Sequence, residues 1–268
     1  MELISRRLKY TTIADAIEFL VRNTPILDGH DAPPAWINYA GAGDFTELGD
    51  RMVRLLEERA GLREGEFVLD IGCGIARNAL ALARRFKTLP YSGFDVVRFG
   101  ITWCRKRFRD RPEFEFRHAD IHNGFYNPRG RIRAIDYRFE YPDATFALAF
   151  AASVITHMPY GEVQHYLAET ARVLKPGGRA YVTAFILDDH ARASIARGVA
   201  EFRFAQPINH AFTEVPEEPE VAVAFDPGVF ERAVVDAGMS VERFYPGNWR
   251  GDPPAEDGQD GYLLRRPA

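Results

Sequence analysis

The sequence is poor in the residue types that mark several classes of protein. Its 268 residues include two cysteines, Cys73 and Cys104, too few for a disulfide framework or a zinc cluster. Lysine and arginine number 34 against 38 aspartates and glutamates, a net charge of −4, whereas a general nucleic-acid binder usually has a basic excess. No apolar run reaches the roughly 18 residues of a membrane span, and the amino-terminal stretch lacks the apolar core of a signal peptide. These absences predict a cytoplasmic protein with no nucleic-acid or membrane partner.

What the sequence does have is a regular alternation of two apolar patterns. Short apolar runs typical of strands fall at 67–71, 91–96, 113–118, 144–152 and 179–187. Helical spacing of apolar residues precedes the first run, at 48–60, and falls between later ones, at 78–85, 100–107 and 163–174. Such alternation indicates βαβ units around a parallel sheet. We expect one domain over residues 1–268, made of a helical lead-in with a loop (1–47), a core (48–190), a variable lid-like segment (198–225) and a terminal helix with two strands (226–268).

The chemistry concentrates where the first predicted strand ends, in Val68–Arg77. Gly72 and Gly74 flank Cys73 there, and glycines let a backbone turn tightly and approach a ligand closely. The helix that follows offers N–H groups to an anion, and open α/β sheets bind ligands at the carboxyl ends of their strands. The turn, including Cys73, therefore predicts a binding site for a small anionic or zwitterionic cofactor.

The residues beside these glycines narrow the choice of cofactor. A dinucleotide fingerprint needs a third glycine, and Arg77 stands at that position. Asp70 precedes the first glycine by two residues and suits a ligand that carries an ammonium group. A strand-to-helix turn without a ligand is the alternative. The segment Val68–Arg77 resembles motif I of class I S-adenosylmethionine-dependent methyltransferases, which implies S-adenosylmethionine as the cofactor.

Three later segments resemble the same family in the same order. Asp95 ends the second strand and is followed by Val96; an acid here can accept hydrogen bonds from both ribose hydroxyls, in an NAD site as well. The resemblance places Asp120 where the adenine amino group is received and Ile121 against the adenine ring. Asp120 could instead be a turn or cap carboxylate. Residues 174–179 resemble the family's structural turn before the fifth strand.

A narrower resemblance is carried by residues 37–45, 126–130 and 153–158. They look like segments of a bacterial subgroup linked to sugar, polysaccharide or natural-product methylation. This resemblance implies four further contacts with the cofactor: Tyr39 and Gly43 above it, Arg77 at its carboxylate, and the backbone of Ala151 at its ammonium group.

The family resemblance implies a doubly wound, Rossmann-like α/β fold, with a seven-stranded sheet that is mostly parallel, one antiparallel strand near the edge and helices on both faces. The implied function is methyl transfer from S-adenosylmethionine to a hydroxyl of a small molecule, a sugar or a natural product. N-methylation of an amino sugar or amine is the alternative. An NAD-dependent oxidoreductase and a cofactor-binding protein without turnover also stay open. The latter is suggested by Ala76, which replaces a usual glycine, and Ala147, which stands where Phe-Asp usually opens the fourth strand.

His157 is the candidate catalytic residue. It follows the fourth predicted strand, at the end of the sheet where ligands bind. A histidine suits the role of general base for an oxygen nucleophile, because its unperturbed pKa lies near neutrality. The same ring could instead hydrogen-bond the backbone or cap the next helix.

Two variable segments and one tryptophan have open roles. The loop 122–142 could bind a phosphorylated sugar or be a solvated surface, since it carries Arg129, Arg131, Arg133 and Arg138. The aromatic residues of 198–225 could cover the acceptor, pack on the domain or form a dimer contact, and Trp249 could line the acceptor pocket or lie in the core. The histidines are not spaced with carboxylates or cysteines as a metal site requires, so we predict no metal. The sequence is compatible with a monomer or a homodimer, and it leaves the acceptor unidentified.

Overall fold

The computed structural model describes residues 14–24, 32–41, 43–251 and 255–268. The backbone divides into two compact units, Met1–Tyr137 and Arg138–Ala268, and each is described by itself. The predicted amino-terminal lead-in lies partly outside the described residues, and its described helix is α2, Ala14–Asn23. The expectation of a single domain stays a prediction.

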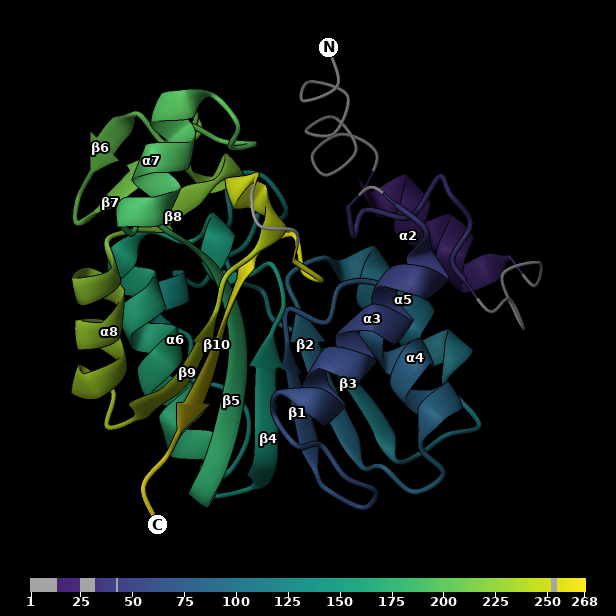
Figure 1. The fold of residues 1–268 in the computed structure, drawn as a ribbon. Coiled ribbons are helices and arrows are strands. Elements are labelled where there is room, and N and C mark those ends of the chain that lie inside the picture. Colours follow the sequence, from purple (N-terminus) through teal and green to yellow (C-terminus); the bar gives the residue numbers. More distant parts are fainter. Residues whose placement is uncertain (1–13, 25–31, 42, 252–254) are drawn as a thin grey trace. The chain divides into compact units, whose positions relative to one another are not determined.

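The first unit contains a three-stranded parallel sheet with helices between its strands (Figure 1). Its elements after α2 are α3 (Phe45–Glu58), β1 (Val68–Ile71), α4 (Arg77–Arg85), β2 (Tyr91–Asp95), α5 (Arg98–Arg107), β3 (Phe114–His118) and the 3-10 helix η2 (Ala134–Asp136). β2 pairs with both β1 and β3, and every residue of β1 and β2 is buried. The carboxyl ends of the three strands therefore share one edge, as parallel strands require.

Local sequence signals place the helices of this unit. Asp44 caps α3 by accepting the N–H of Glu47 at 2.7 Å, the usual role of an N-cap aspartate. Gly49 lets α3 lie against α4, because a Cβ at that position would be 2.8 Å from the carbonyl oxygen of Arg77. Lys106 on α5 donates to three carbonyl oxygens at the carboxyl end of α2. Close packing and hydrogen bonds at the helix ends thus stabilise the positions of the helices around the glycine turn.

The second unit is built around a long strand, β5 (Leu174–Ile186). β4 (Phe146–Ala151) and β8 (Val223–Phe225) pair with β5 in parallel, and β10 (Asp260–Arg265) is antiparallel to both β5 and β9 (Ser240–Tyr245). The other elements are η3 (Ile155–His157), α6 (Tyr160–Val173), α7 (Asp189–Arg197), β6 (Gln206–Ile208), β7 (Ala211–Thr213), η4 (Pro219–Val221), α8 (Pro227–Asp236) and η5 (Asn248–Arg250). Helices α6 and α8 pack on each other beside this sheet (Figure 1).

The predicted fold class is confirmed: the strands are mostly parallel, and the last one runs antiparallel. The strand count differs from the predicted seven, because the described residues contain ten strands. The unpredicted ones, β6, β7 and β8, have three residues each and lie in the segment that the sequence marks as a lid. Strands this short carry too few residues for a periodic pattern. Their pairing is decided by tertiary contacts.

The fifth strand begins earlier than the sequence predicts. α6 ends at Val173 and β5 starts at Leu174, so residues 175–178 belong to the strand instead of forming a turn before it. The pairing with β4 shifts register there, and Gly177 has a φ of 70°. Extra residues inserted in one strand form a bulge, and glycine supplies the left-handed conformation that the bulge needs. The predicted start at residue 179 is therefore wrong.

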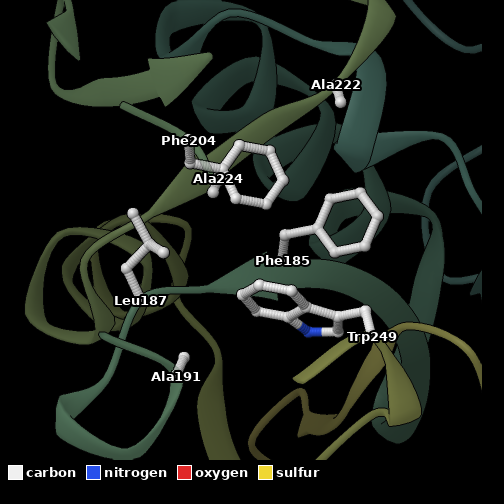
Figure 2. Packing of buried hydrophobic residues seen from close by; sticks show 7 residues of the cluster. All are labelled: Phe185, Leu187, Ala191, Phe204, Ala222, Ala224 and Trp249. Carbon is white, nitrogen blue, oxygen red and sulfur yellow. The ribbon is translucent and has the colours of Figure 1, made fainter. Parts of the chain in front are cut away.

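The variable segment packs into an apolar cluster of the second unit (Figure 2). The indole ring of Trp249 faces the rings of Phe185 and Phe204, with centroids 5.4 and 5.6 Å apart. Trp249 is 1% exposed, which places it in the core and not in a pocket wall. Phe202 and Phe212 are partly buried against the same cluster. Of the roles open to these aromatic residues, the structure shows packing on the domain.

Trp249 also joins a buried polar network that no sequence pattern predicts. Four groups donate to the carboxylate of Asp260 at 2.7–2.9 Å: the indole of Trp249, the guanidinium of Arg250, and the backbone N–H groups of Ile186 and Gly247. Arg250 donates in addition to both carboxylate oxygens of Asp188, at 2.8 and 2.7 Å. Because Asp188 caps α7, the network ties α7 to β10 and to η5.

Candidate functional site

Asp70 lies on β1, two residues before the glycine turn, and is fully buried. The hydroxyl of Tyr91 on β2 donates to its Oδ2 at 2.9 Å. Gly93 leaves room for this contact, since a Cβ there would lie 2.6 Å from the Tyr91 hydroxyl oxygen. Residues two apart on a strand share a face, so Tyr91, Gly93 and Asp95 follow one another along β2. The strand thus presents a hydroxyl, a gap and a carboxylate on one face.

The second oxygen of Asp70 is left without a partner. Oδ1 is buried and makes no hydrogen bond with the described residues. Burial raises the pKa of Asp70 to about 7; the charge of Asp95 adds to the shift, and the Tyr91 hydroxyl opposes it. A buried polar atom with no hydrogen bond costs roughly 1–3 kcal/mol, so such atoms are rare in native folds and call for an explanation. A ligand that supplies the missing partner is one.

The turn after β1 holds three residues in the left-handed region of the backbone: Gly72 at φ 73°, Gly74 at φ 57° and Ala76 at φ 62°. Glycine adopts this conformation freely, whereas it costs another L-residue roughly 1–2 kcal/mol. Ala76 therefore departs from the family pattern at a position that glycine would suit better. No side chain caps α4, which begins directly after Ala76.

Asp95 is held by the glycine turn and by its own strand end. The N–H of Gly74 donates to Oδ2 at 2.9 Å, and the N–H of Val97 donates to Oδ1 at 2.8 Å. The hydroxyl of Tyr39 reaches Oδ1 at 3.2 Å, and a Cβ at Gly100 would block it, lying 2.2 Å from the Tyr39 oxygen. Burial raises the pKa of Asp95, while the backbone donors oppose the shift. Two sequence-predicted residues, Tyr39 and Asp95, are thus brought into contact.

The other predicted residues around the turn differ in exposure. Gly43 is exposed, with a φ of 104°, and Val96 is half-buried after β2. Cys73 and Cys104 are buried free thiols, and burial raises the pKa of both well above the ordinary value. The side chain of Cys73 is therefore part of the interior, where it packs as a protonated thiol.

Arg77 begins α4 and is half-buried. Its guanidinium forms no ion pair or hydrogen bond with another described residue. Burial lowers the pKa of Arg77, and the charge of Asp70 opposes this through space. Removing a cation from water is costly unless a partner compensates. Among the described residues, the turn thus lies beside one cationic group without an ion pair, from Arg77, and one carboxylate oxygen without a hydrogen bond, from Asp70.

Asp120 follows β3 and anchors the arginine-rich loop. Its carbonyl oxygen accepts the N–H groups of Arg131 and Ile132, both at 3.0 Å, and its carboxylate pairs with the Arg131 guanidinium at 2.6 Å. The hydrogen bond from Arg131 lowers the pKa of Asp120. Ile121 is buried, and its backbone bridges to Ile132. Asp120 is therefore a turn carboxylate here, as the sequence allows, and its contact with adenine stays a prediction.

Each of the four arginines in the loop 122–142 pairs with an aspartate: Arg129 with Asp15, Arg131 with Asp120, Arg133 with Asp136 and Arg138 with Asp143. The four arginine side chains are 63–82% exposed. Exposed pairs of this kind contribute about 0–1 kcal/mol each. These contacts fit the interpretation of the loop as a solvated surface.

The remaining predicted residues lie after β4, in the second unit. Ala151 ends β4 and is buried. His157 ends η3 and is half-buried, with Nδ1 2.9 Å from the carbonyl oxygen of Glu220. Burial lowers the pKa of His157, against the backbone contacts with Glu220 and Val221, so the ring is neutral at pH 7. A backbone hydrogen bond was the alternative to catalysis, and the role of base stays a prediction.

Sequence reasoning does not identify several residues that shape the first unit's site. Tyr91 and Gly93 occupy alternate positions before Asp95, and this period of two is the signal that could have found them. Gly100 offers no such signal, because Tyr39, which needs the space, is distant in sequence. Close approaches between distant segments become visible only in the fold.

The described residues contain no group of three or more His, Cys, Asp or Glu side chains placed to hold a metal ion. No described helix is long and apolar enough to cross a membrane. The absence of a metal from the reaction stays a prediction.

Comparison with known proteins identifies the domain. Residues 68–178 match the family described as a methyltransferase domain. Methyltransferase GfsG of Streptomyces halstedii is 28% identical over 65% of this chain and 59% of its own length. The 27-O-demethylrifamycin SV methyltransferase of Amycolatopsis mediterranei is 32% identical over 53% of this chain and 45% of its own. The chain therefore spans about half the length of these curated relatives.

Among solved structures, the CcbJ methyltransferase of Streptomyces caelestis matches with a TM-score of 0.56, over 98% of this chain and 99% of CcbJ. At 14% identity this likeness shows the fold alone. The matched residues 68–178 include the glycine turn, Asp95 and Asp120, so the family match and the predicted motifs coincide. The predicted resemblance is confirmed, and with it the cofactor. Over residues 68–178 the chain is thus similar to the methyltransferase domain family, in agreement with the resemblance to class I methyltransferases that use S-adenosylmethionine.

Proposed function

We propose that the chain transfers a methyl group from S-adenosylmethionine to a hydroxyl of a small molecule, a sugar or a natural product. The observation that carries the proposal is the pair of unsatisfied groups beside the glycine turn. Arg77 has no anionic partner among the described residues, and Oδ1 of Asp70 has no donor. The amino-acid part of S-adenosylmethionine is a zwitterion, which offers a carboxylate to the first and an ammonium group to the second. The residues present therefore fit the cofactor.

The same proposal gives roles to the other predicted residues. Asp95 receives the ribose hydroxyls, with Tyr39 and the N–H of Gly74 fixing the orientation of its carboxylate. The glycine turn, together with Gly43, lets the backbone approach the ligand. Asp120 and Ile121 make the contacts that the family resemblance assigns to the adenine, and the backbone of Ala151 makes the one assigned to the ammonium group. Val96 is a further cofactor-binding residue.

The cofactor supplies an activated methyl group on a sulfonium, so the chain's main contribution is alignment. For a hydroxyl acceptor we propose His157 as the base. Burial lowers its pKa, which keeps the imidazole neutral and able to take a proton at pH 7. The preference for oxygen is supported by the rifamycin relative, which is named for an O-demethylated compound. The same alignment would serve a neutral amine, and the product of an acceptor screen distinguishes the two.

Calorimetric titration tests the cofactor assignment. The wild-type chain is titrated with S-adenosylmethionine, S-adenosylhomocysteine and NADH, beside Arg77→Gln and a control, Arg133→Gln, whose exposed arginine pairs with Asp136. We expect both sulfur ligands to bind and NADH not to bind. Arg77→Gln should lose roughly 10–100-fold in affinity, since a charge-assisted hydrogen bond contributes about 1.5–3 kcal/mol, and the control should lose nothing. A folded wild-type chain that binds NADH, or neither sulfur ligand, would overturn the proposal.

A further inference from the structure

In the second unit, residues 206–222, which we call the flap, contact the start of α6 and the 3-10 helix η3 before it. The imidazole Nδ1 of His157 on η3 is 2.9 Å from the carbonyl oxygen of Glu220 on η4, and η4 packs on η3. Because a carbonyl oxygen can only accept, Nδ1 carries the proton and donates it. The ring of Tyr160, which begins α6, lies against His210 in the turn between β6 and β7, with ring centroids 5.1 Å apart. The flap is therefore attached at η4 and at its β6–β7 turn.

The flap has hydrogen bonds of its own that hold its shape. β6 pairs with β7 as an antiparallel hairpin. The buried hydroxyl of Thr213 on β7 lies 3.3 Å from the carbonyl oxygen of Pro219, the first residue of η4, and 3.1 Å from that of Ala222, which follows η4. β8 then joins the flap to β5. Loss of the contacts with η3 and α6 would leave these bonds intact, so the flap can open as one piece.

Glu162, in the first turn of α6, meets the flap without a compensating group. It is half-buried, and its carboxyl forms no ion pair or hydrogen bond with another described residue. The charge that bears on it is that of Glu220 on the flap. Burial and a like charge both disfavour the ionised form of a carboxyl group. The closed flap therefore makes the charged form of Glu162 unfavourable.

Other titratable and charged groups surround this end of α6 but do not offset Glu220. They lie on η3, on the flap, on β5, on α6 itself and on α8, which packs on α6: His157, His210, Glu218, Lys175, Arg179, His165, Glu231, Arg232 and Asp236. Among the described residues, Glu220 is the one charge that shifts the pKa of Glu162, which burial and then Glu220 raise to about 7. Burial lowers the pKa of His157, so at pH 7 its ring is neutral and does not compensate either.

We propose that Glu162 and Glu220 form a pH-dependent latch: the flap stays closed on η3 and α6 while Glu162 is protonated, and it opens more readily when both carboxylates are charged. Opening returns Glu162 to water and its pKa towards the ordinary 4.5, so the closed form binds the proton more tightly. By linkage, closure weakens as the pH rises from about 5 to 7. Opening also breaks the hydrogen bond that orients the ring of His157. The latch goes beyond the proposed function and does not depend on it.

Amide hydrogen exchange, followed peptide by peptide with mass spectrometry, measures how often the flap opens. The full chain without added ligand is compared with Glu162→Gln, Glu220→Gln, the double variant and a control, Glu217→Gln, at pH 8 and at pH 5. Each variant is compared with wild type at the same pH, so the intrinsic pH dependence of exchange cancels. Glu217 is an exposed acid of the same flap, so the control changes the charge of the flap equally.

At pH 8 we expect Glu162→Gln to slow exchange in the flap about fivefold, less than the full pKa shift implies because water screens a half-buried group, and to leave it unchanged at pH 5. Glu220→Gln should slow exchange about twofold at pH 8 and add nothing in the Glu162→Gln background, since the repulsion needs both charges. Glu217→Gln should have no effect. Three results would overturn the proposal: equal slowing at both pH values, additive effects of the two substitutions, or a wild-type flap as protected at pH 8 as β5, which would open only when the whole unit unfolds.

Discussion

Two fully buried aspartates, Asp70 in the first unit and Asp260 in the second, differ in how completely their carboxylates are satisfied. Asp260 accepts hydrogen bonds from four groups, one of them the guanidinium of Arg250. Asp70 accepts one, from Tyr91, and its other oxygen has no hydrogen bond among the described residues, although the Asn78 side chain and the charge of Arg77 partly oppose the rise in its pKa. Both carboxylates are removed from water to the same extent. They differ in how many protein hydrogen bonds replace those lost with water.

The difference indicates that Asp260 stabilises the fold, whereas Asp70 is suited to binding a ligand. A buried charge surrounded by donors stabilises the fold around it, and removing one partner exposes the full cost of desolvating the other. A buried carboxylate that lacks donors lowers the stability of the chain that carries it. Such groups are typical of binding and catalytic sites. Arg77, half-buried and without an ion pair among the described residues, fits the same interpretation.

The largest effect is expected at the satisfied aspartate. Asp260→Asn should lower the free energy of unfolding at pH 7 by about 3–5 kcal/mol, the range for breaking a buried ion pair. The amide NH2 of the new asparagine is itself a donor, so it would replace a carboxylate oxygen that accepts hydrogen bonds and would face the donors around it. Chemical denaturation measures the change. Asp136→Asn is the control, because its exposed pair with Arg133 contributes at most about 1 kcal/mol. Similar losses in the two variants would contradict the comparison.

The same substitution at Asp70 should have the opposite sign. The pKa of Asp70 is raised to about 7, so folding takes up a proton between its ordinary value and 7, and the chain loses stability as the pH rises through that range. Asp70→Asn removes this loss. We expect the variant to be more stable than wild type at pH 8 by about 1–3 kcal/mol, with little difference at pH 4.

Thermal unfolding at the two pH values checks this prediction, in the absence of added ligand. The variant should at the same time bind S-adenosylhomocysteine more weakly, because the ammonium group loses its carboxylate. A variant that is less stable than wild type at pH 8 would show that Asp70 is a structural acid like Asp260.

A smaller effect of the same sign is expected at Glu162, in the first turn of α6. It is half-buried, and burial, together with the charge of Glu220, raises its pKa to about 7. Its ionised form therefore lowers stability as the pH rises towards 8. Glu162→Gln should stabilise the chain by about 1 kcal/mol at pH 8, less than the full shift implies because water screens the group, and by nothing measurable at pH 4. A stability difference that does not change with pH would contradict the assignment.

Much of the fold could be predicted because its signals are local. The apolar runs and the glycine turn place β1, β2 and β4 to within two residues, and they place Asp70 and Asp95 at strand ends. The short strands β6, β7 and β8 could not be predicted, since three residues carry no period. The start of β5 was misplaced because a Pro-Gly-Gly sequence is locally typical of a turn. In the structure these residues belong to β5, and its pairing with β4 shifts register there as a bulge.

By itself the sequence determined the α/β class, the position of the glycine turn and the order of the acids that follow it, because these depend on period and on neighbouring residues. Only the tertiary structure decided which buried groups have partners. It showed that Asp260 is enclosed by donors, that Asp70 Oδ1 and the Arg77 guanidinium make no hydrogen bond with the described residues, and that Thr183 and Gln259 meet at Ser153. The physical reason is that hydrogen bonding and desolvation depend on contacts between segments far apart in the chain, which no local pattern encodes.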